Sequence, residues 1–210
     1  MVKSGRVITS SPLCTSIGQR ILNTTDNPVD ASVAALLCLS VVAPHQCSLA
    51  AGAFVLMRNN GVDKFLDLQF GAPNNTHNGA PVAVPRFLTG LKTAMKDYGS
   101  IPFSQVAQPS IDLATKGFPL TNEMSFLVDS KSEVWKKYFP VAGNTVKSPV
   151  LANTLKIAAA GERGFSLGED ISRATNGTVS SEDYSSYQKT VKWEDAVSID
   201  VAGWFEIFVS

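Results

Sequence analysis

An apolar run over residues 33–43 constrains the fold of this chain more than any other feature of its sequence. Asn27 can cap a helix in front of it, Pro28 suits the first helical position, and Asp30 falls in the first turn, at the positive end of the helix dipole. Pro44 ends the run, which is shorter than the ~20 residues that a membrane span needs. Because such a helix is apolar on most sides, the sequence predicts that it is buried within a larger globular structure.

Composition and charge exclude several classes of function. Of the 210 residues, 44% are hydrophobic and 17% charged, which is ordinary for a globular protein, and we expect a single domain over residues 1–210. The 18 basic residues balance the 18 acidic ones, so we expect neither a nucleic-acid partner nor electrostatic binding to a membrane surface. We also expect no membrane segment, and no signal peptide is visible, so the chain is either cytosolic or given without its leader.

The remaining pattern predicts a mixture of strands at both ends and helices between them, an α/β (α+β) class. Its clearest element is a hairpin through Asn59-Asn60-Gly61. Strands are expected over Arg6–Thr9, Ala53–Arg58, Lys64–Phe70, Thr190–Trp193 and Gly203–Val209. Helices are expected over Ser16–Leu22, Phe87–Tyr98, Phe103–Lys116, Thr121–Tyr138 (one or two), Val150–Ala160 and Phe165–Ala174, with a capped acidic turn after Ser180. The last strand either pairs with an earlier one or needs a partner that these residues do not supply.

Few residues in the chain could carry self-contained chemistry. His45 and Cys47 lie two residues apart, where an extended chain would point them to opposite sides, and His77 falls in a polar loop. Cys14, Cys38 and Cys47 match no zinc or redox motif; they allow at most one disulfide, and three unpaired thiols are favoured. We therefore predict no complete active site, no metal and no cofactor in this chain.

Three Asn-x-Ser/Thr sequons begin at Asn23, Asn74 and Asn176. Such sequons are acceptors for N-linked glycans in secreted proteins. They hint at a glycoprotein of the secretory pathway or the extracellular space.

A series of short segments, in order and over about residues 5–209, resembles the heavy subunit of the gamma-glutamyltranspeptidase (glutathione hydrolase) family. The segments are Gly5–Leu13, Gly18–Leu22, Asn27–Ala35, Val41–His45, Gly52–Leu56, Leu66-Asp67, Ala72-Pro73, Tyr98-Gly99, Gln108–Ala114, Gly117–Pro119, Leu151–Leu155, Gly164-Phe165 and Glu182–Tyr187. Each segment is a weak signal alone, and their common order makes the resemblance specific.

The resemblance implies an αββα sandwich of the N-terminal-nucleophile hydrolase type, here incomplete. In that family a precursor cuts itself into two subunits, and the new N-terminal Thr of the light subunit attacks the γ-amide of glutathione or a similar compound, with its own α-amino group as base. The chain would be a heavy-subunit portion truncated before the catalytic light subunit. We therefore expect no catalytic residue in it, a light subunit as its partner, and a small γ-glutamyl compound as its ligand.

This sequence departs from the family pattern where the family binds its donor. Gln69 stands where the family's Arg grips the glutamate α-carboxylate, and Phe70 stands where the family has Glu. Losing such a charge-assisted contact costs about 1.5–3 kcal/mol, or about ten- to a hundredfold in affinity. In addition, Cys47–Ala51 replace the family's glycine-rich turn before Gly52.

Gln69 is therefore the candidate substrate-binding residue, with three alternatives open for the chain. It is a donor-binding portion of such an enzyme, a non-catalytic relative that acts by binding, or part of an acylase or amidase whose donor lacks the α-carboxylate. A further interpretation of Gln69 and Phe70 is an ordinary pair of strand residues that bind nothing.

Overall fold

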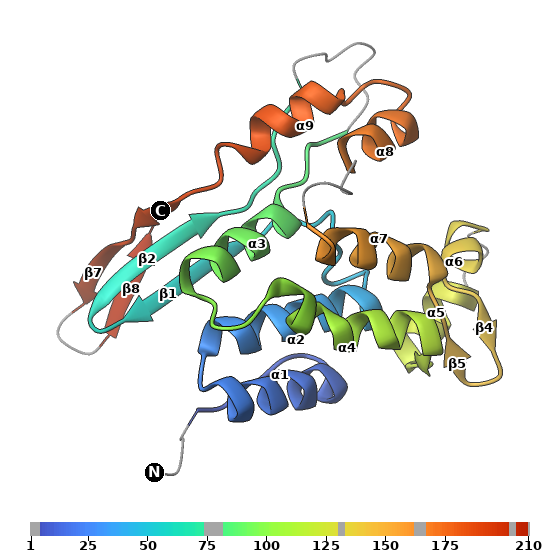
Figure 1. Cartoon of the computed structure of the whole chain (residues 1–210), viewed down its shortest axis with the longest axis horizontal. Helices are drawn as coiled ribbons and strands as arrows, with labels where there is room; N and C mark the ends of the chain where they lie inside the picture. The colour runs from blue at the N-terminus through green and yellow to red at the C-terminus, as the bar shows by residue number, and fades with distance from the viewer. Residues whose placement is uncertain (1–4, 74–81, 130–132, 162–166, 202–204, 210) are drawn as a thin grey trace. The chain divides into compact units, whose positions relative to one another are not determined.

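The computed structural model describes residues 5–73, 82–129, 133–161, 167–201 and 205–209. The chain forms two compact units, the first built from Met1–Leu49 and Ala94–Phe165, the second from Ala50–Thr93 and Ser166–Ser210. The first unit is mostly helical, and the second combines helices with antiparallel strands (Figure 1). The mixture of helices and strands agrees with the predicted class.

The predicted apolar helix forms the centre of the first unit. It is α2 (Pro28–Val42), and Asn27 caps it by accepting hydrogen bonds from the amides of Val29 and Asp30 at 2.8 and 3.2 Å. Helices α1 (Pro12–Thr25) and α4 (Phe103–Lys116) pack against α2, and α7 (Pro149–Ala159) packs against α4 (Figure 1). Burial on nearly all sides follows from the composition of α2. Its buried residues are Asp30, Ala31, Val33, Ala34, Ala35, Leu37, Cys38, Ser40, Val41 and Val42.

The expected strand at Arg6–Thr9 is wrong, because side chains of α1 take up its main-chain groups. The amide of Val7 donates to Oε1 of Gln19, and the amide of Thr9 donates to Oγ1 of Thr15, both at 3.0 Å. The segment thus runs extended along the helix. Helix α1 itself begins at Pro12, four residues earlier than expected, since proline fits the first helical turn.

Two motif segments of the first unit meet beside the start of α2. Asp30 is fully buried, and its carboxylate accepts hydrogen bonds from the amide and the hydroxyl of Ser100 at 2.9 and 2.5 Å. The side-chain amide of Asn27 donates to the carbonyl of Tyr98 at 2.8 Å. A Cβ at Gly99 would lie 2.5 Å from the carbonyl oxygen of Met95, so only glycine fits between these contacts.

Small elements complete the first unit. Helix α4 ends as predicted at Gly117, whose φ is +109°. The predicted helical stretch after it forms two helices, α5 (Asn122–Asp129) and α6 (Glu133–Tyr138). Three short strands, β3 (Phe118–Pro119), β4 (Val141–Ala142) and β5 (Thr145–Val146), form a sheet in the order β3-β5-β4.

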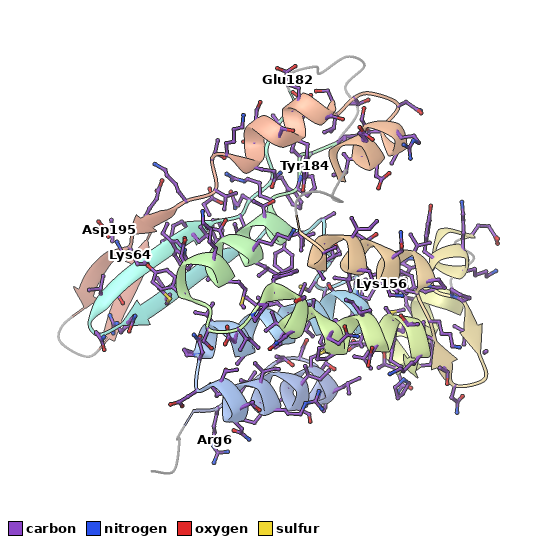
Figure 2. All side chains as sticks on the ribbon, viewed as in Figure 1. Arg6, Lys64, Lys156, Glu182, Tyr184 and Asp195 are labelled. Carbon is purple, nitrogen blue, oxygen red and sulfur yellow. A yellow bond between two sulfur atoms is a disulfide. The ribbon has the colours of Figure 1, made fainter. Side chains whose placement is uncertain are left out.

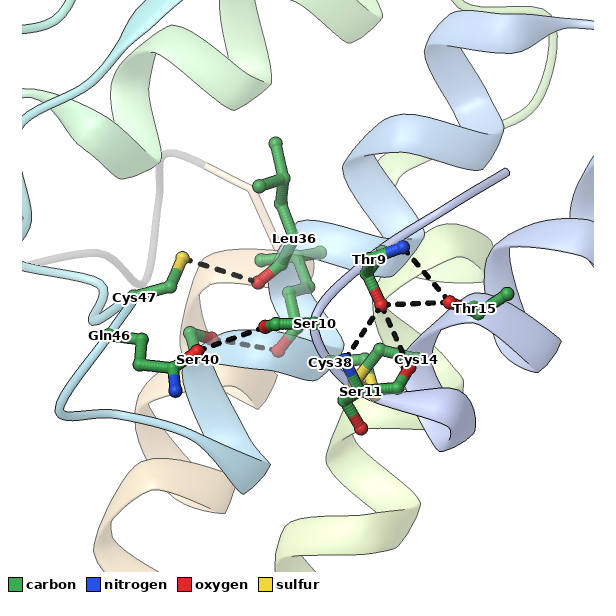
Figure 3. Close-up of a disulfide and its surroundings, with 11 residues drawn as sticks. Thr9, Ser10, Ser11, Cys14, Thr15, Leu36, Cys38, Ser40, Gln46 and Cys47 are labelled. Carbon is green, nitrogen blue, oxygen red and sulfur yellow. Dashed lines mark hydrogen bonds between the residues drawn. A yellow bond between two sulfur atoms is a disulfide. The ribbon is translucent and has the colours of Figure 1, made fainter. Parts of the chain in front are cut away.

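A disulfide between Cys14 of α1 and Cys38 of α2 corrects the expectation of three unpaired thiols (Figure 3). Both residues are fully buried, and their Cα atoms lie 5.4 Å apart. Cys47 remains free; its Sγ faces the carbonyl of Leu36 at 3.9 Å, and burial raises the pKa of this thiol to about 11. The first unit is thus cross-linked between the two helices that build its core.

The second unit contains the predicted hairpin. Strands β1 (Phe54–Asn59) and β2 (Val62–Asp67) pair antiparallel, and β6 (Trp193–Asp195) adds to β2. Asn60 and Gly61 have φ of +50° and +79°, as a two-residue hairpin turn requires. Lys64 of β2 and Asp195 of β6 form an ion pair at 2.6 Å (Figure 2).

Three helices and a second hairpin complete this unit. They are the first half of α3 (Phe87–Tyr98), α8 (Leu167–Ala174), α9 (Ser181–Gln188), β7 (Val197–Val201) and β8 (Phe205–Val209). The final strand therefore pairs with an earlier one, β7. Ser180 and Asp183 form a capping box, as the cap prediction requires, but α9 continues beyond a single turn to Gln188. The strand expected over residues 190–193 begins only at Trp193.

Candidate functional site

Gln69 lies just beyond the end of β2, in the second unit. Main-chain hydrogen bonds between Ala53 and Leu68, at 2.9 and 3.3 Å, continue the pairing of the two strands past their ends. Side chains alternate along a strand, so the buried Leu68 faces the core whereas Gln69, like Asp67, points to the other side. The alternation leaves the carboxamide of Gln69 exposed.

A shallow pocket of about 360 Å³ surrounds this residue. It is lined by Gly52, Ala53, Phe54, Gln69 and Phe70. A Cβ at Gly52 would lie 3.2 Å from Cε2 of Phe70, so the absence of a side chain at this glycine lets the ring lie against the main chain. The pocket offers two aromatic rings and one carboxamide, and none of its five lining residues carries a charge. It suits an apolar group that bears one hydrogen-bonding function.

A guanidinium stands next to Gln69, on a residue that the sequence analysis missed. Arg86, 9% exposed, donates from Nε to the carbonyl of Gln69 at 2.7 Å and from Nη1 to the hydroxyl of Thr190 at 3.1 Å. Its Nη2 lies 3.4 Å from Oδ2 of Asp67, and its Cζ lies 4.9 Å from the ring centroid of Tyr187. Because Asp67 and neutral partners engage this cation, its charge is compensated within the protein. These five residues are called the Arg86 cluster below.

Neighbouring contacts hold the Arg86 cluster together. Gly71 and Val84 form an isolated antiparallel bridge, with hydrogen bonds of 3.0 and 2.8 Å. A Cβ on Gly71 would lie 2.0 Å from the ring of Tyr187, so the ring rests directly on the main chain there. The side-chain amide of Gln188 donates to the carbonyl of Pro85 at 2.9 Å. The end of α9 is thereby fixed against the chain before α3.

The structure gives the other sequence candidates ordinary partners. Nε2 of His45 lies 3.5 Å from the carboxylate of Glu123, in the first unit. The raised pKa of Cys47 keeps its thiol protonated at neutral pH, so it is a poor nucleophile. His77 and Asn74 lie outside the described residues.

Searches for a metal cluster and for a membrane span covered only the described parts of the chain. In those parts, no three His, Cys, Asp or Glu side chains gather in a way that could hold a metal ion. None of the helices described there has the length and apolar character needed to cross a membrane.

Comparisons with known proteins point to one family. The family described as Gamma-glutamyltranspeptidase has a sequence profile that matches residues 14–207. Glutathione hydrolase 7 of Homo sapiens is 29% identical over 222 residues, which cover 90% of this chain and 34% of the human protein. The chain therefore spans about a third of the length of this relative.

Two crystal structures share the fold. The Bacillus anthracis transpeptidase enzyme CapD, crystal form II, superposes with a TM-score of 0.87 at 26% identity, covering 99% of this chain and 76% of that one. The Helicobacter pylori gamma-glutamyltranspeptidase gives a TM-score of 0.82 at 27% identity, covering 97% of this chain and 69% of that one. These similarities confirm the predicted fold class, in incomplete form.

Proposed function

Because the chain belongs to the gamma-glutamyltranspeptidase family, we propose that it is the front portion of a heavy subunit that helps to bind the donor in γ-glutamyl transfer or glutathione hydrolysis. In this proposal the nucleophilic threonine comes from a light subunit, and the chain alone is inactive. The pocket at Gln69 supports the proposal, because the sequence resemblance assigns to Gln69 the position of the family's donor-binding arginine, and Arg86 holds the main chain there.

Exposed apolar side chains on β1 support a protein partner. Phe54 and Leu56 are 57% and 47% exposed, and their spacing of two residues puts them on the same face of the strand. Within the described sheet β1 is an edge strand, in the order β1-β2-β6. The apolar side chains on the face of β1 and the outer main-chain edge of this strand both offer contacts to another polypeptide, and a light subunit would fill that role.

Reconstitution tests the proposal. The purified chain and a light subunit from a family member are assayed, separately and mixed, for the release of aniline from a γ-glutamyl anilide. We expect release from the mixture only. Turnover by the chain alone would refute the assignment of the nucleophile to a partner, and a mixture no more active than the light subunit alone would refute the role in donor binding.

A second candidate donor follows from the uncharged lining of the pocket. No charged side chain lines it, and the nearby Arg86 is engaged by Asp67. The uncharged lining also fits an acylase or amidase donor without an α-carboxylate. Comparing γ-glutamyl and butyryl anilides in the reconstituted enzyme separates the two, and Gln69→Arg should shift the preference toward the γ-glutamyl substrate by about ten- to a hundredfold.

We place the protein in the secretory pathway or outside the cell. The Cys14–Cys38 disulfide supports this location, because disulfides persist in oxidising compartments and are rare in the cytosol. Trapping of free thiols in protein taken directly from its source tests it. If both cysteines are found alkylated, the proposed location is wrong.

A further inference from the structure

The turn that follows α8 carries an Asn-Gly-Thr sequon in a conformation that suits modification. Asn176 and Gly177 have φ of +50° and +79°, and both are exposed. Their main-chain amides donate to the carbonyls of Arg173 and Ser172 at 3.3 and 2.8 Å, so the turn is fixed by its own backbone. Among the described residues, no side-chain hydrogen bond engages the carboxamide of Asn176 or the hydroxyl of Thr178.

Asn23, the other described sequon asparagine, is placed very differently. It lies in the last turns of α1, and its Oδ1 accepts a hydrogen bond from Nε2 of Gln19 at 2.9 Å. The hydroxyl of Thr25 donates to the carbonyl of Ile21 at 3.1 Å and accepts from the amide of Asn27 at 3.2 Å. The side chains of Asn23 and Thr25 are therefore both engaged in hydrogen bonds. The one between Thr25 and Asn27 helps to join α1 to α2.

Helical geometry adds to this difference. A glycosyltransferase must take the asparagine and the hydroxyl two residues later into one active site. In a helix, residues i and i+2 do not face each other. In a turn, an asparagine side chain readily reaches the groups two residues further on. The sequon at Asn176 meets the requirement in the folded chain, whereas the one at Asn23 would have to unwind the end of α1.

The disulfide gives independent evidence about the cellular compartment in which the protein folds. Cys14 and Cys38 are fully buried and bonded in the first unit, which is typical of a protein that passes through an oxidising compartment. N-linked glycans are added to Asn-x-Ser/Thr on the same route. An exposed sequon with unengaged side chains would meet the transferase there.

We propose that Asn176 carries an N-linked oligosaccharide and that Asn23 does not. In the transfer, the carboxamide nitrogen of Asn176 bonds to C1 of the first sugar of a lipid-diphosphate-linked oligosaccharide. The bond between C1 and the diphosphate oxygen breaks, the lipid diphosphate leaves with the electron pair, and the nitrogen loses one proton to a base of the transferase. This modification is separate from the proposed donor binding, and either can fail without the other.

Site-specific mass spectrometry tests the proposal. The full chain is produced behind a secretory leader in eukaryotic cells, and both the secreted and the retained protein are digested before and after treatment with an amide-cleaving glycosidase, which leaves aspartate at each glycosylated asparagine. We expect this conversion at Asn176 and not at Asn23. A peptide with unmodified Asn176 from disulfide-bonded protein, or a glycan at Asn23, would overturn the proposal.

Matched variants test whether the glycan at Asn176 depends on the sequon. Asn176→Gln and Thr178→Ala should each abolish the glycan at this site. Thr178→Ser keeps the sequon and should retain the glycan, and Asn23→Gln should leave the glycan at Asn176 unchanged. Retention of the modification in Thr178→Ala would show that the attachment does not follow the sequon and would also refute the proposal.

Discussion

Replacing Arg86 by methionine keeps a long apolar side chain in place and removes the guanidinium that ties three segments of the second unit together. The charge-assisted hydrogen bond to the carbonyl of Gln69 contributes about 1.5–3 kcal/mol. The contact with the Tyr187 ring adds about 0.5–2 kcal/mol. The pair with Asp67 adds less than about 1 kcal/mol, because the Asp67 side chain is 46% exposed and water replaces its partner.

We therefore expect Arg86→Met to lower the free energy of unfolding by about 2–6 kcal/mol. Arg86→Lys is the matched control: it keeps a cation near Asp67 and Tyr187 but lacks the Nε–H that reaches the carbonyl, so it should lose about half as much. The measurement is urea unfolding followed by tryptophan fluorescence. A Trp135→Phe background removes the signal of the first unit, and Trp193 of β6 then reports on the second unit.

Two outcomes would refute this reasoning. A loss below about 1 kcal/mol for Arg86→Met would mean that the Arg86 cluster does not stabilise the second unit. A loss for Arg86→Lys that equals or exceeds the loss for Arg86→Met would mean that the positive charge near Asp67 and Tyr187 does not stabilise the Arg86 cluster.

Three further predictions concern the first unit. Replacing Cys14 and Cys38 together by alanine should lower the free energy of unfolding by about 3–4 kcal/mol, from the loop entropy of a sequence separation of 24, as urea unfolding would measure; an unchanged midpoint would contradict this. Alkylation of Cys47 at pH 8 should be about a hundredfold slower than that of a thiol with the pKa of 9.0, because burial raises its pKa to about 11, and the rate should climb as the pH approaches that value; a rate that is flat with pH would contradict this. Ser100→Ala leaves the buried Asp30 carboxylate without its hydroxyl donor and should cost about 1.5–3 kcal/mol in thermal or urea unfolding, with Ser104→Ala on the exposed side of α4 as a neutral control.

Elements with local signals could be predicted from the sequence. Asn27, Pro28 and Pro44 mark the ends of α2 through capping and proline geometry that depend only on adjacent residues. The turn at Asn60-Gly61 is equally local, because those residues adopt the positive φ that the hairpin needs. Both predictions are confirmed.

Features that depend on distant residues could not be predicted in this way. Arg86 meets Gln69 across 17 residues and Thr190 across 104, and nothing near Arg86 indicates those partners. The disulfide joins cysteines 24 apart at a spacing that matches no motif. Strand β7 had a signal that was missed, because Val197–Val201 alternates apolar and polar residues. The segment at residues 6–9 has β-branched residues but finds its partners on a helix.

The contact between Arg86 and Gln69 has a consequence for which residues position 69 can accept. The guanidinium donates a hydrogen bond to the main-chain carbonyl at position 69, and the side chain there is exposed. The residue at this position can therefore be exchanged while the hydrogen bond from Arg86 keeps the main chain in place. An arginine at position 69 would accept the same hydrogen bond from Arg86, because Arg86 binds the carbonyl there and not the side chain.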